Sequence, residues 1–516
     1  MNHHTHFNIR NSLPSLAIAS GGGGIDIRSL FLLLAGIVAF TLGVTQAAEK
    51  PNIIFFLVDD MGWMDCGVYG SEYYETPNID AFAKKGVQFT QAYAQPMCSP
   101  SRASLLSGQA VARHGITAAA GHALEVGKQL PPPATRKFMR PEQITLAEAM
   151  RDAGYATAHL GKWHLGVSTE HQPAAQGFDM VFSAQPSAGP PGKQRDGLCY
   201  FSPYGVLPEG TPTNRDKVGT ITDGPDGEYI TDRLTDEAIA FMNAHKEGPF
   251  FLNLWHYAVH GPWGAKEDYI EHFKDKQDPR GQQSNSIMAA MLRSVDESLG
   301  RILEELDRLG LAENTLVIFY SDNGGSIKSL REGHICLEDW EKWGIPKDVP
   351  PTSNAPLREG KGKLYEGGVR VPLLASWPGV IPAGRTAEAI VRSEDFYPTI
   401  LDLAGVPKPA QQTLDGSSFA AVLRDPSLER DVPAFFPTQF GVAVRSGDWK
   451  LILNYKDKSH ELYNLGEDLS ETNNLAAQHP ERVRGMFKQL EDHFISTGCE
   501  MRRDIRDVIQ ARSQKR

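Results

Sequence analysis

The stretch PNIIFFLVDD (residues 51–60) combines a short, unbroken apolar run with two acidic residues at its end. An apolar run of this length, from Ile53 to Val58, is typical of a strand that is buried on both faces, as in a parallel sheet. A second run of this kind, residues 315–320, ends in the polar stretch SDNGG. Helical patterns lie between the strand-like runs, for example at 144–154 and 284–309. This alternation predicts an α/β fold with a large mixed, mostly parallel sheet sandwiched by helices.

Hard oxygen side chains follow both of these apolar runs. Asp59 and Asp60 follow the first, and Asp322 and Asn323 follow the second. In open α/β sheets, ligands bind outside the carboxyl ends of the strands. A single acidic pair after a strand is more often a turn or a helix cap. Two such pairs favour a site for a calcium-like or magnesium-like ion, because such ions prefer oxygen ligands.

The stretch CSPSRASLLSG (residues 98–108) places a cysteine at the expected start of a helix. Pro100 suits the first helical position, and Gly108 suits the end of the helix. A helix N-terminus attracts anions, and Arg102 lies one turn beyond Cys98 on the same face. A lone cysteine in a globular chain is more often buried and inert. The cysteine, the helix N-terminus and the arginine together suit an oxyanion substrate such as sulfate or phosphate.

Two further segments contribute basic side chains. The stretch GKWHLG (residues 161–166) is expected to be extended, so that Lys162 and His164 point to the same face. The apolar run from Phe250 to about Tyr257 predicts another strand, and His260 follows it just before a turn. A histidine inside such a run, as at position 256, is more often a core residue than a functional one.

The charge distribution favours an anionic substrate. The chain has 52 Lys and Arg against 63 Asp and Glu, a net charge of −11. A cationic pocket on such an acidic surface can concentrate an anion locally. The sequence shows no continuous basic stripe, so we expect no nucleic-acid partner. The residues assigned to this pocket are Arg102, Lys162, His164, His260 and Lys361, the last from the glycine-rich segment GKGK.

The motifs VDDMGW, CSPSRASLLSG, GKWHLG, VHGP, SDNGG and GKGKLYEGGVRVP occur in the order seen in sulfatases of the alkaline-phosphatase-like superfamily. The chain therefore resembles a formylglycine-dependent sulfatase over most of its length. This resemblance implies a catalytic domain at 49–428. The segments DWKLILN and ELYNLGEDLSETNNLA resemble the small, antiparallel C-terminal subdomain of that family, which we place at 429–516.

The resemblance also implies a cofactor set and a reaction, the hydrolysis of sulfate monoesters. A maturation enzyme would oxidise Cys98 to formylglycine, the nucleophile. One divalent cation, usually calcium in this family and alternatively magnesium, would be held by Asp59, Asp60, Asp322, Asn323 and an oxygen of the modified Cys98. Lys162 and Lys361 would contact the sulfate, His260 would lie near the leaving oxygen, and His164 would lie near the formylglycine.

The sequence allows more than one substrate, more than one function and more than one number of disulfides. The substrate is a sulfated small molecule or a sulfated glycan. The competing interpretations are a phosphonate or phosphate monoester hydrolase on the same scaffold and a catalytically silent carbohydrate-binding relative. The five cysteines show no metal-type spacing, and they allow one or two disulfides without implying any.

The N-terminal residues 1–48 are interpreted as an extension followed by a signal peptide. The apolar run from Leu30 to Val44 is shorter than the ~20 residues needed to span a bilayer, and small residues suited to cleavage follow it. We therefore expect export to the periplasm or beyond and no stable membrane span. An uncleaved membrane anchor is the alternative.

Overall fold

The computed structural model describes residues 50–119, 136–183, 189–194, 197–204, 220–328, 335–337, 340–346 and 348–499. The chain divides into two units, residues 1–49 and 50–516, and every described residue belongs to the second. The expected signal peptide at 29–48 therefore lies outside the described residues. Within the described ranges, no helix is both long enough and apolar enough to cross a lipid bilayer.

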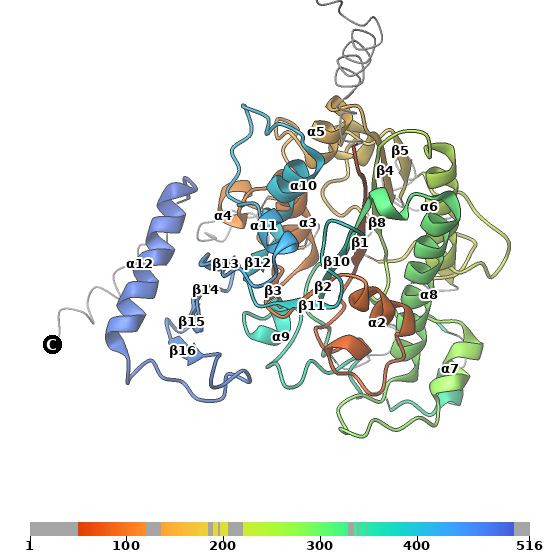
Figure 1. Cartoon of the computed structure of the whole chain (residues 1–516). Coiled ribbons are helices and arrows are strands. Elements are labelled where there is room, and N and C mark those ends of the chain that lie inside the picture. The colour runs from red at the N-terminus through yellow and green to blue at the C-terminus, as the bar shows by residue number, and fades with distance from the viewer. Residues whose placement is uncertain are drawn as a thin grey trace, which may run out of the picture. The chain divides into compact units, whose positions relative to one another are not determined.

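An eight-stranded sheet with the strand order β11-β2-β10-β9-β1-β8-β4-β5 lies at the centre of the described chain (Figure 1). Its core is parallel, because β1 pairs in parallel with β8 and β9, and β8 pairs in parallel with β4. β10 runs antiparallel to β9 and β2. This arrangement confirms the predicted mixed, mostly parallel sheet. The strands are β1 (Asn52–Val58), β2 (Val87–Phe89), β4 (Ala156–Gly161), β5 (Met180–Phe182), β8 (Phe250–Trp255), β9 (Thr315–Ser321), β10 (Leu373–Ser376) and β11 (Arg385–Ala387).

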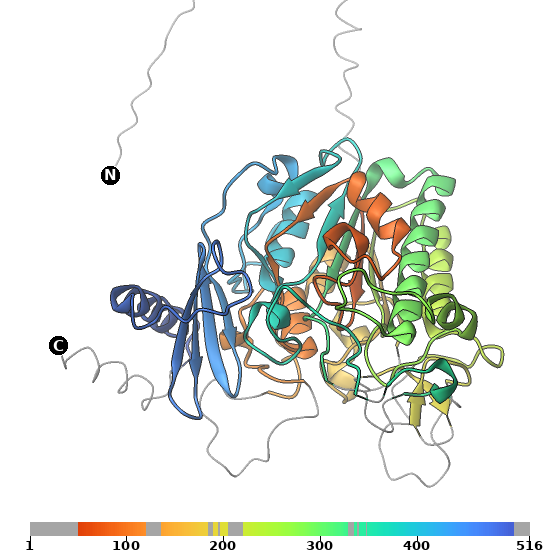
Figure 2. The same ribbon diagram turned by 90° about the horizontal axis from the view of Figure 1, so that it is seen from below.

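Helices cover both faces of this sheet, as Figures 1 and 2 show. Alternate side chains of β1 point to opposite faces, so Ile54 and Phe56 join one core and Ile53 and Phe55 join the other. The first core includes α2 (Pro77–Lys84), α6 (Ile230–Ala244), α7 (Glu267–Phe273) and α8 (Ser286–Leu309). The second includes α3 (Cys98–Ser107), α5 (Leu146–Asp152), α10 (Phe396–Ala404) and α11 (Ala420–Arg424).

The strand register brings distant parts of the sequence together at one edge of the sheet. Val58, the last residue of β1, lies opposite Ser321, the last residue of β9. Gly161 at the end of β4 lies opposite Trp255 at the end of β8. The segments that follow these four strands therefore start side by side, at the carboxyl edge where ligands bind in folds of this class.

A four-stranded antiparallel sheet follows near the C-terminus, as predicted. It consists of β13 (Ala434–Pro437), β14 (Gly441–Ser446), β15 (Trp449–Asn454) and β16 (His460–Asn464), drawn in blue in Figure 2. Side chains of α12 (Pro480–Ser496) pack on one face of this sheet. The other face contacts residues of the preceding chain, including Tyr93 and Val369.

Short elements and one disulfide complete the described chain. Cys199 and Cys336 form the disulfide, which joins segments that are 137 residues apart in the sequence. The remaining strands and α-helices are β3 (Ala92–Tyr93), α4 (Val111–His114), β6 (Gly192–Gln194), β7 (Gly197–Cys199), α9 (Glu366–Val369) and β12 (Val391–Arg392). The 3-10 turns are Gly67–Tyr69, Thr169–His171, Pro173–Gln176, Ala312–Asn314, Trp340–Trp343 and Ser393–Asp395.

Candidate active site

Cys98 is the first residue of α3 and is 1% exposed. The helix therefore begins two residues before Pro100, which the sequence places at the first helical position. Pro100 is still in the first turn, where its missing N–H needs no partner. Burial raises the pKa of the Cys98 thiol to about 11 despite two nearby lysines. The unmodified side chain consequently keeps its proton at neutral pH.

Arg102 is fully buried one turn further along α3. Its guanidinium lies 2.8 Å from Asp322 Oδ2 and donates to the carbonyl of Lys162 at 2.6 Å. It also lies 3.9 Å from Asp59 Oδ1 and over the ring of Trp255. One arginine thus joins the segments that follow β1, β4 and β9.

Lys162 is the direct neighbour of Cys98. Its ammonium lies 3.4 Å from Cys98 Sγ and 2.5 Å from Asp59 Oδ2, and both charged groups are fully buried. Burial, reinforced by the neighbouring Asp322 carboxylate, raises the pKa of Asp59 well above its usual value. A buried carboxylate in this position needs positive charge beside it to stay ionised.

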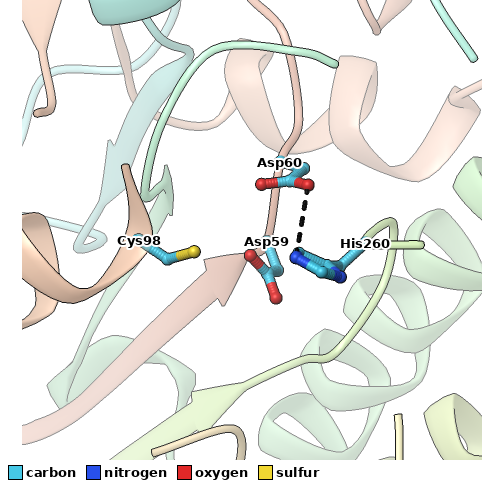
Figure 3. Close-up of side chains that lie close together, drawn as sticks. All are labelled: Asp59, Asp60, Cys98 and His260. Carbon is cyan, nitrogen blue, oxygen red and sulfur yellow. Dashed lines mark ion pairs between the residues drawn. The ribbon is translucent and has the colours of Figure 1, made fainter. Parts of the chain in front are cut away.

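Asp60 is the contact point for three further predicted residues. Lys361 Nζ lies 2.6 Å from Asp60 Oδ1, and Asn323 Nδ2 donates to the same oxygen at 2.8 Å. His260 Nε2 lies 3.8 Å from Asp60 Oδ2, the pair marked by the dashed line in Figure 3. Burial opposes ionisation of Asp60, but Lys361 and His260 outweigh it and hold the pKa of this carboxyl below its usual range.

His164 is buried and contacts Ser99, the residue after Cys98, but its segment is not extended as predicted. His164 has φ 61°, in the left-handed region that non-glycine residues seldom adopt, so the rule that residues i and i+2 share a face does not apply. Its carbonyl accepts a hydrogen bond from Ser99 Oγ at 2.8 Å. Trp163 lies in the core, as expected. His256 is also a core residue, since it is fully buried and pairs with Ser298 at 3.1 Å.

Glycines allow the loops around the site to pack backbone against backbone. A Cβ on Gly324, in the SDNGG stretch, would lie 1.8 Å from the carbonyl oxygen of Gly367. A Cβ on Gly368 would lie 2.2 Å from the carbonyl oxygen of Lys363. Only glycine fits such close approaches. The glycine pairs of the SDNGG and EGGV stretches thus join the loop after β9 to the loop that carries Lys361.

The oxygen-rich side chains fit a hard divalent cation. Potential ligand atoms of Asp59, Asp60, Cys98 and His260 lie within 4.8 Å of one another (Figure 3). Asp59 Oδ1 and Asn323 Oδ1 are buried without a hydrogen-bond partner, a state that a bound cation would relieve. Asp322 lies beside this group, where its Oδ1 accepts from the N–H of Asp60 at 3.2 Å. The side-chain oxygens of Asp59, Asp60, Asp322 and Asn323 are donors of the kind that calcium and magnesium prefer.

One residue that the sequence analysis did not single out also holds the site together. Ser101 Oγ donates to the carbonyl of Asp322 at 2.5 Å and accepts from the N–H of Gln95 at 2.9 Å. It thereby joins α3 to the loop after β9. Nothing in the sequence marks this serine, because its partners are backbone groups and one of them, Asp322, is 221 residues away.

Buried carboxylates beside buried cationic groups, at the carboxyl edge of a mostly parallel sheet, form a site that could hold a cation and bind an anionic ester. The chain belongs to the sulfatase family, the sulfuric ester hydrolases of the alkaline-phosphatase-like superfamily. The family model "Sulfatase" matches residues 51–406. A second model, "N-sulphoglucosamine sulphohydrolase, C-terminal", matches residues 360–497.

Relatives and solved structures agree with this assignment. A sulfatase of Formosa agariphila is 33% identical over 87% of this chain and 88% of its own length. The N-acetylgalactosamine-6-sulfatase of Rattus norvegicus is 32% identical over 87% of this chain and 80% of its own. The crystal structure of Ps i-CgsB in complex with k-i-k-neocarrahexaose has a TM-score of 0.70 and 29% identity, and it covers 86% of this chain and 93% of its own.

Proposed function

We propose that this chain hydrolyses sulfate monoesters to an alcohol and inorganic sulfate through an oxidised Cys98 and one divalent cation. The observation that carries the proposal is the meeting of Arg102, Lys162 and Lys361 with three buried carboxylates around Cys98. Sulfate esters resist hydrolysis because their negative charge repels nucleophiles and their alkoxide is a poor leaving group. A site that neutralises charge and supplies a proton addresses both barriers.

In this proposal each basic side chain has a separate role. Lys162 Nζ, 3.4 Å from Cys98 Sγ, binds an oxygen of the sulfuryl group next to the nucleophile. Lys361 Nζ and His260 Nε2 approach from the side of Asp60, where they hold the remaining sulfuryl oxygens, and one of the two donates the proton to the leaving oxygen. Arg102 pairs with Asp322 and approaches Asp59, and so holds both side chains in place. His164, whose backbone carbonyl accepts a hydrogen bond from Ser99 Oγ, accepts the proton that is removed when sulfate is released.

The cation and the modified cysteine complete the proposed chemistry. Asp59, Asp60, Asp322, Asn323 and an oxygen of the modified Cys98 would hold the cation, which supplies positive charge beside the nucleophile. Calcium is our first assignment and magnesium the alternative. Oxidation of Cys98 to formylglycine by a maturation enzyme would supply an aldehyde hydrate, whose two hydroxyl groups provide both the nucleophile and a route for the release of sulfate.

We further propose a sulfated sugar as the substrate and an exported enzyme. The names of the rat relative and of the neocarrahexaose complex support the sugar, because both refer to carbohydrates. The Cys199–Cys336 disulfide is consistent with an oxidising compartment, and residues 29–48 resemble a signal peptide. Residues 49–428 would form the catalytic domain and 429–516 its C-terminal subdomain.

The proposal is tested by comparing the turnover of one aryl alcohol as its sulfate and as its phosphate ester. We expect faster turnover of the sulfate, loss of this turnover on chelation, and its recovery when calcium is added back. Cys98→Ser should abolish it, whereas Cys499→Ser, a substitution outside both the disulfide and the site, should leave it unchanged. Faster turnover of the phosphate ester would indicate the phosphatase-type alternative. Full activity of Cys98→Ser would refute the assigned nucleophile.

A further inference from the structure

The segment that carries Lys361 is held by the rest of the site through its backbone. We call residues 358–371 the Lys361 loop. Hydrogen bonds join this loop to the residues that follow Asp322 and Asn323 and to the residues that precede Cys98. The bonds run from Lys361 N–H to Gly325 O at 3.0 Å, from Gly324 N–H to Gly368 O at 3.1 Å, from Ala94 N–H to Val369 O at 2.9 Å and from Gly362 N–H to Pro96 O at 2.7 Å.

A third set of contacts joins the Lys361 loop to the C-terminal sheet through Glu366. This side chain is fully buried. Its Oε1 accepts a hydrogen bond from Lys450 Nζ of β15 at 2.9 Å, and its Oε2 accepts from Tyr93 Oη at 2.8 Å. Lys450 is itself fully buried, so this ion pair is not screened by solvent.

Glu471, which follows β16, contacts both Lys450 and Glu366. Its Oε1 lies 3.0 Å from Lys450 Nζ, and its Oε2 accepts from the backbone N–H of Glu366 at 2.7 Å. Its carbonyl accepts from Arg358 Nη1 at 2.7 Å, so it contacts the Lys361 loop at two points. Glu471 has φ 52°, a conformation that side-chain-bearing residues keep only where their surroundings enforce it.

We propose that Lys450 and Glu471 are positioning residues that set the location of Lys361 in the active site. The C-terminal sheet is then part of the catalytic apparatus, because it holds the loop that carries Lys361. This inference rests on the proposed role of Lys361 in binding the sulfuryl group.

The charges explain why the loop depends on Lys450. Without its ammonium, the carboxylates of Glu366 and Glu471 would face each other while buried, and like charges repel strongly where solvent does not screen them. The remaining cationic groups are more distant from Glu366 Oε2, with Arg370 at 3.5 Å and Arg445 at 3.8 Å. Separation of the two carboxylates would displace α9, which follows Lys361 by five residues.

The test is a double-mutant cycle on aryl sulfate turnover. Lys450→Met removes the ammonium and keeps the apolar stem. We expect it to lower kcat/KM between about tenfold and a hundredfold, the range expected when a binding group is misplaced by about 1 Å. In a Lys361→Ala background the same substitution should cost less than about twofold, because the residue that it positions is already absent. Lys488→Met, at an exposed pair with Asp492 in α12, is the matched control and should change kcat/KM less than twofold.

The outcomes separate this inference from the proposed function. If Lys450→Met lowers kcat/KM equally with and without Lys361, the positioning role is overturned, since that result indicates general destabilisation. Full activity of Lys450→Met would also overturn it. Full activity of Lys361→Ala would instead refute the role proposed for Lys361. If Lys450→Met fails to fold, Glu471→Gln decides the question in the same cycle, because glutamine keeps an acceptor for the Glu366 N–H and removes the charge.

Discussion

Replacing Arg102 by methionine removes a buried positive charge and keeps an apolar stem near the ring of Trp255. The substitution eliminates the ion pair with Asp322 at 2.8 Å, the hydrogen bond to the Lys162 carbonyl at 2.6 Å and the longer approach to Asp59 at 3.9 Å. Removing one partner of a buried ion pair costs about 3–5 kcal/mol, because the other partner is left buried and unpaired. We therefore expect the free energy of unfolding to fall by about 3–5 kcal/mol, out of a total of about 5–15 kcal/mol typical of native proteins.

Urea denaturation followed by circular dichroism, with a chelator present, measures this decrease. Arg102→Lys should be less destabilised, by about 1–3 kcal/mol, because lysine keeps the charge but not the two-pronged geometry. Added calcium should reduce the deficit of Arg102→Met, since a bound cation replaces the missing charge. Arg484→Met, at an exposed pair with Glu481, is the control and should cost less than about 1 kcal/mol. A decrease below about 1 kcal/mol in Arg102→Met would refute the reasoning.

Three further variants test other parts of the structure. Gly324→Ala should lower the free energy of unfolding by about 1–3 kcal/mol, because its Cβ would lie 1.8 Å from Gly367 O; unchanged urea denaturation would contradict this close packing. Burial raises the pKa of Asp65 to about 6 from 3.8, so its contribution to stability is present below about pH 4 and is lost as pH rises through about 6. The free energy of unfolding of the wild type, relative to that of Asp65→Asn, should therefore fall by about 3 kcal/mol between pH 4 and 7. Parallel pH profiles of the two unfolding free energies would exclude this effect. Replacing both Cys199 and Cys336 by alanine should cost about 2–5 kcal/mol, and an unchanged Tm would show that the bond does not constrain the unfolded chain.

The acidic side of the site was predictable because it depends on strand ends. Apolar runs identify β1 and β9, and parallel strands bring their carboxyl ends to one edge of the sheet. The acidic pair after β1 and the Asp322–Asn323 pair after β9 were therefore expected at the same edge, and the pairing of β1 with β9 makes them neighbours. The same argument places Lys162 and His260 at this edge, after β4 and β8.

Other features depend on tertiary contacts that no local pattern reports. The left-handed conformation of His164 is accompanied by a hydrogen bond from Ser99, 65 residues away in the sequence, and the expectation of an extended segment was wrong there. The role of Lys450 was also not predictable, because a lysine in a strand of alternating polar and apolar residues normally faces solvent. Its two carboxylate partners come from separate segments of the chain, and only the fold shows that they meet.

Oxidation of Cys98 in the active enzyme can be measured through the mass of the peptide that contains this residue, taken from enzyme with demonstrated sulfatase turnover. Our account predicts that the fraction of this peptide carrying an aldehyde in place of the thiol rises in proportion to the specific activity across preparations. Full turnover by protein in which Cys98 is uniformly an unmodified thiol would contradict the account.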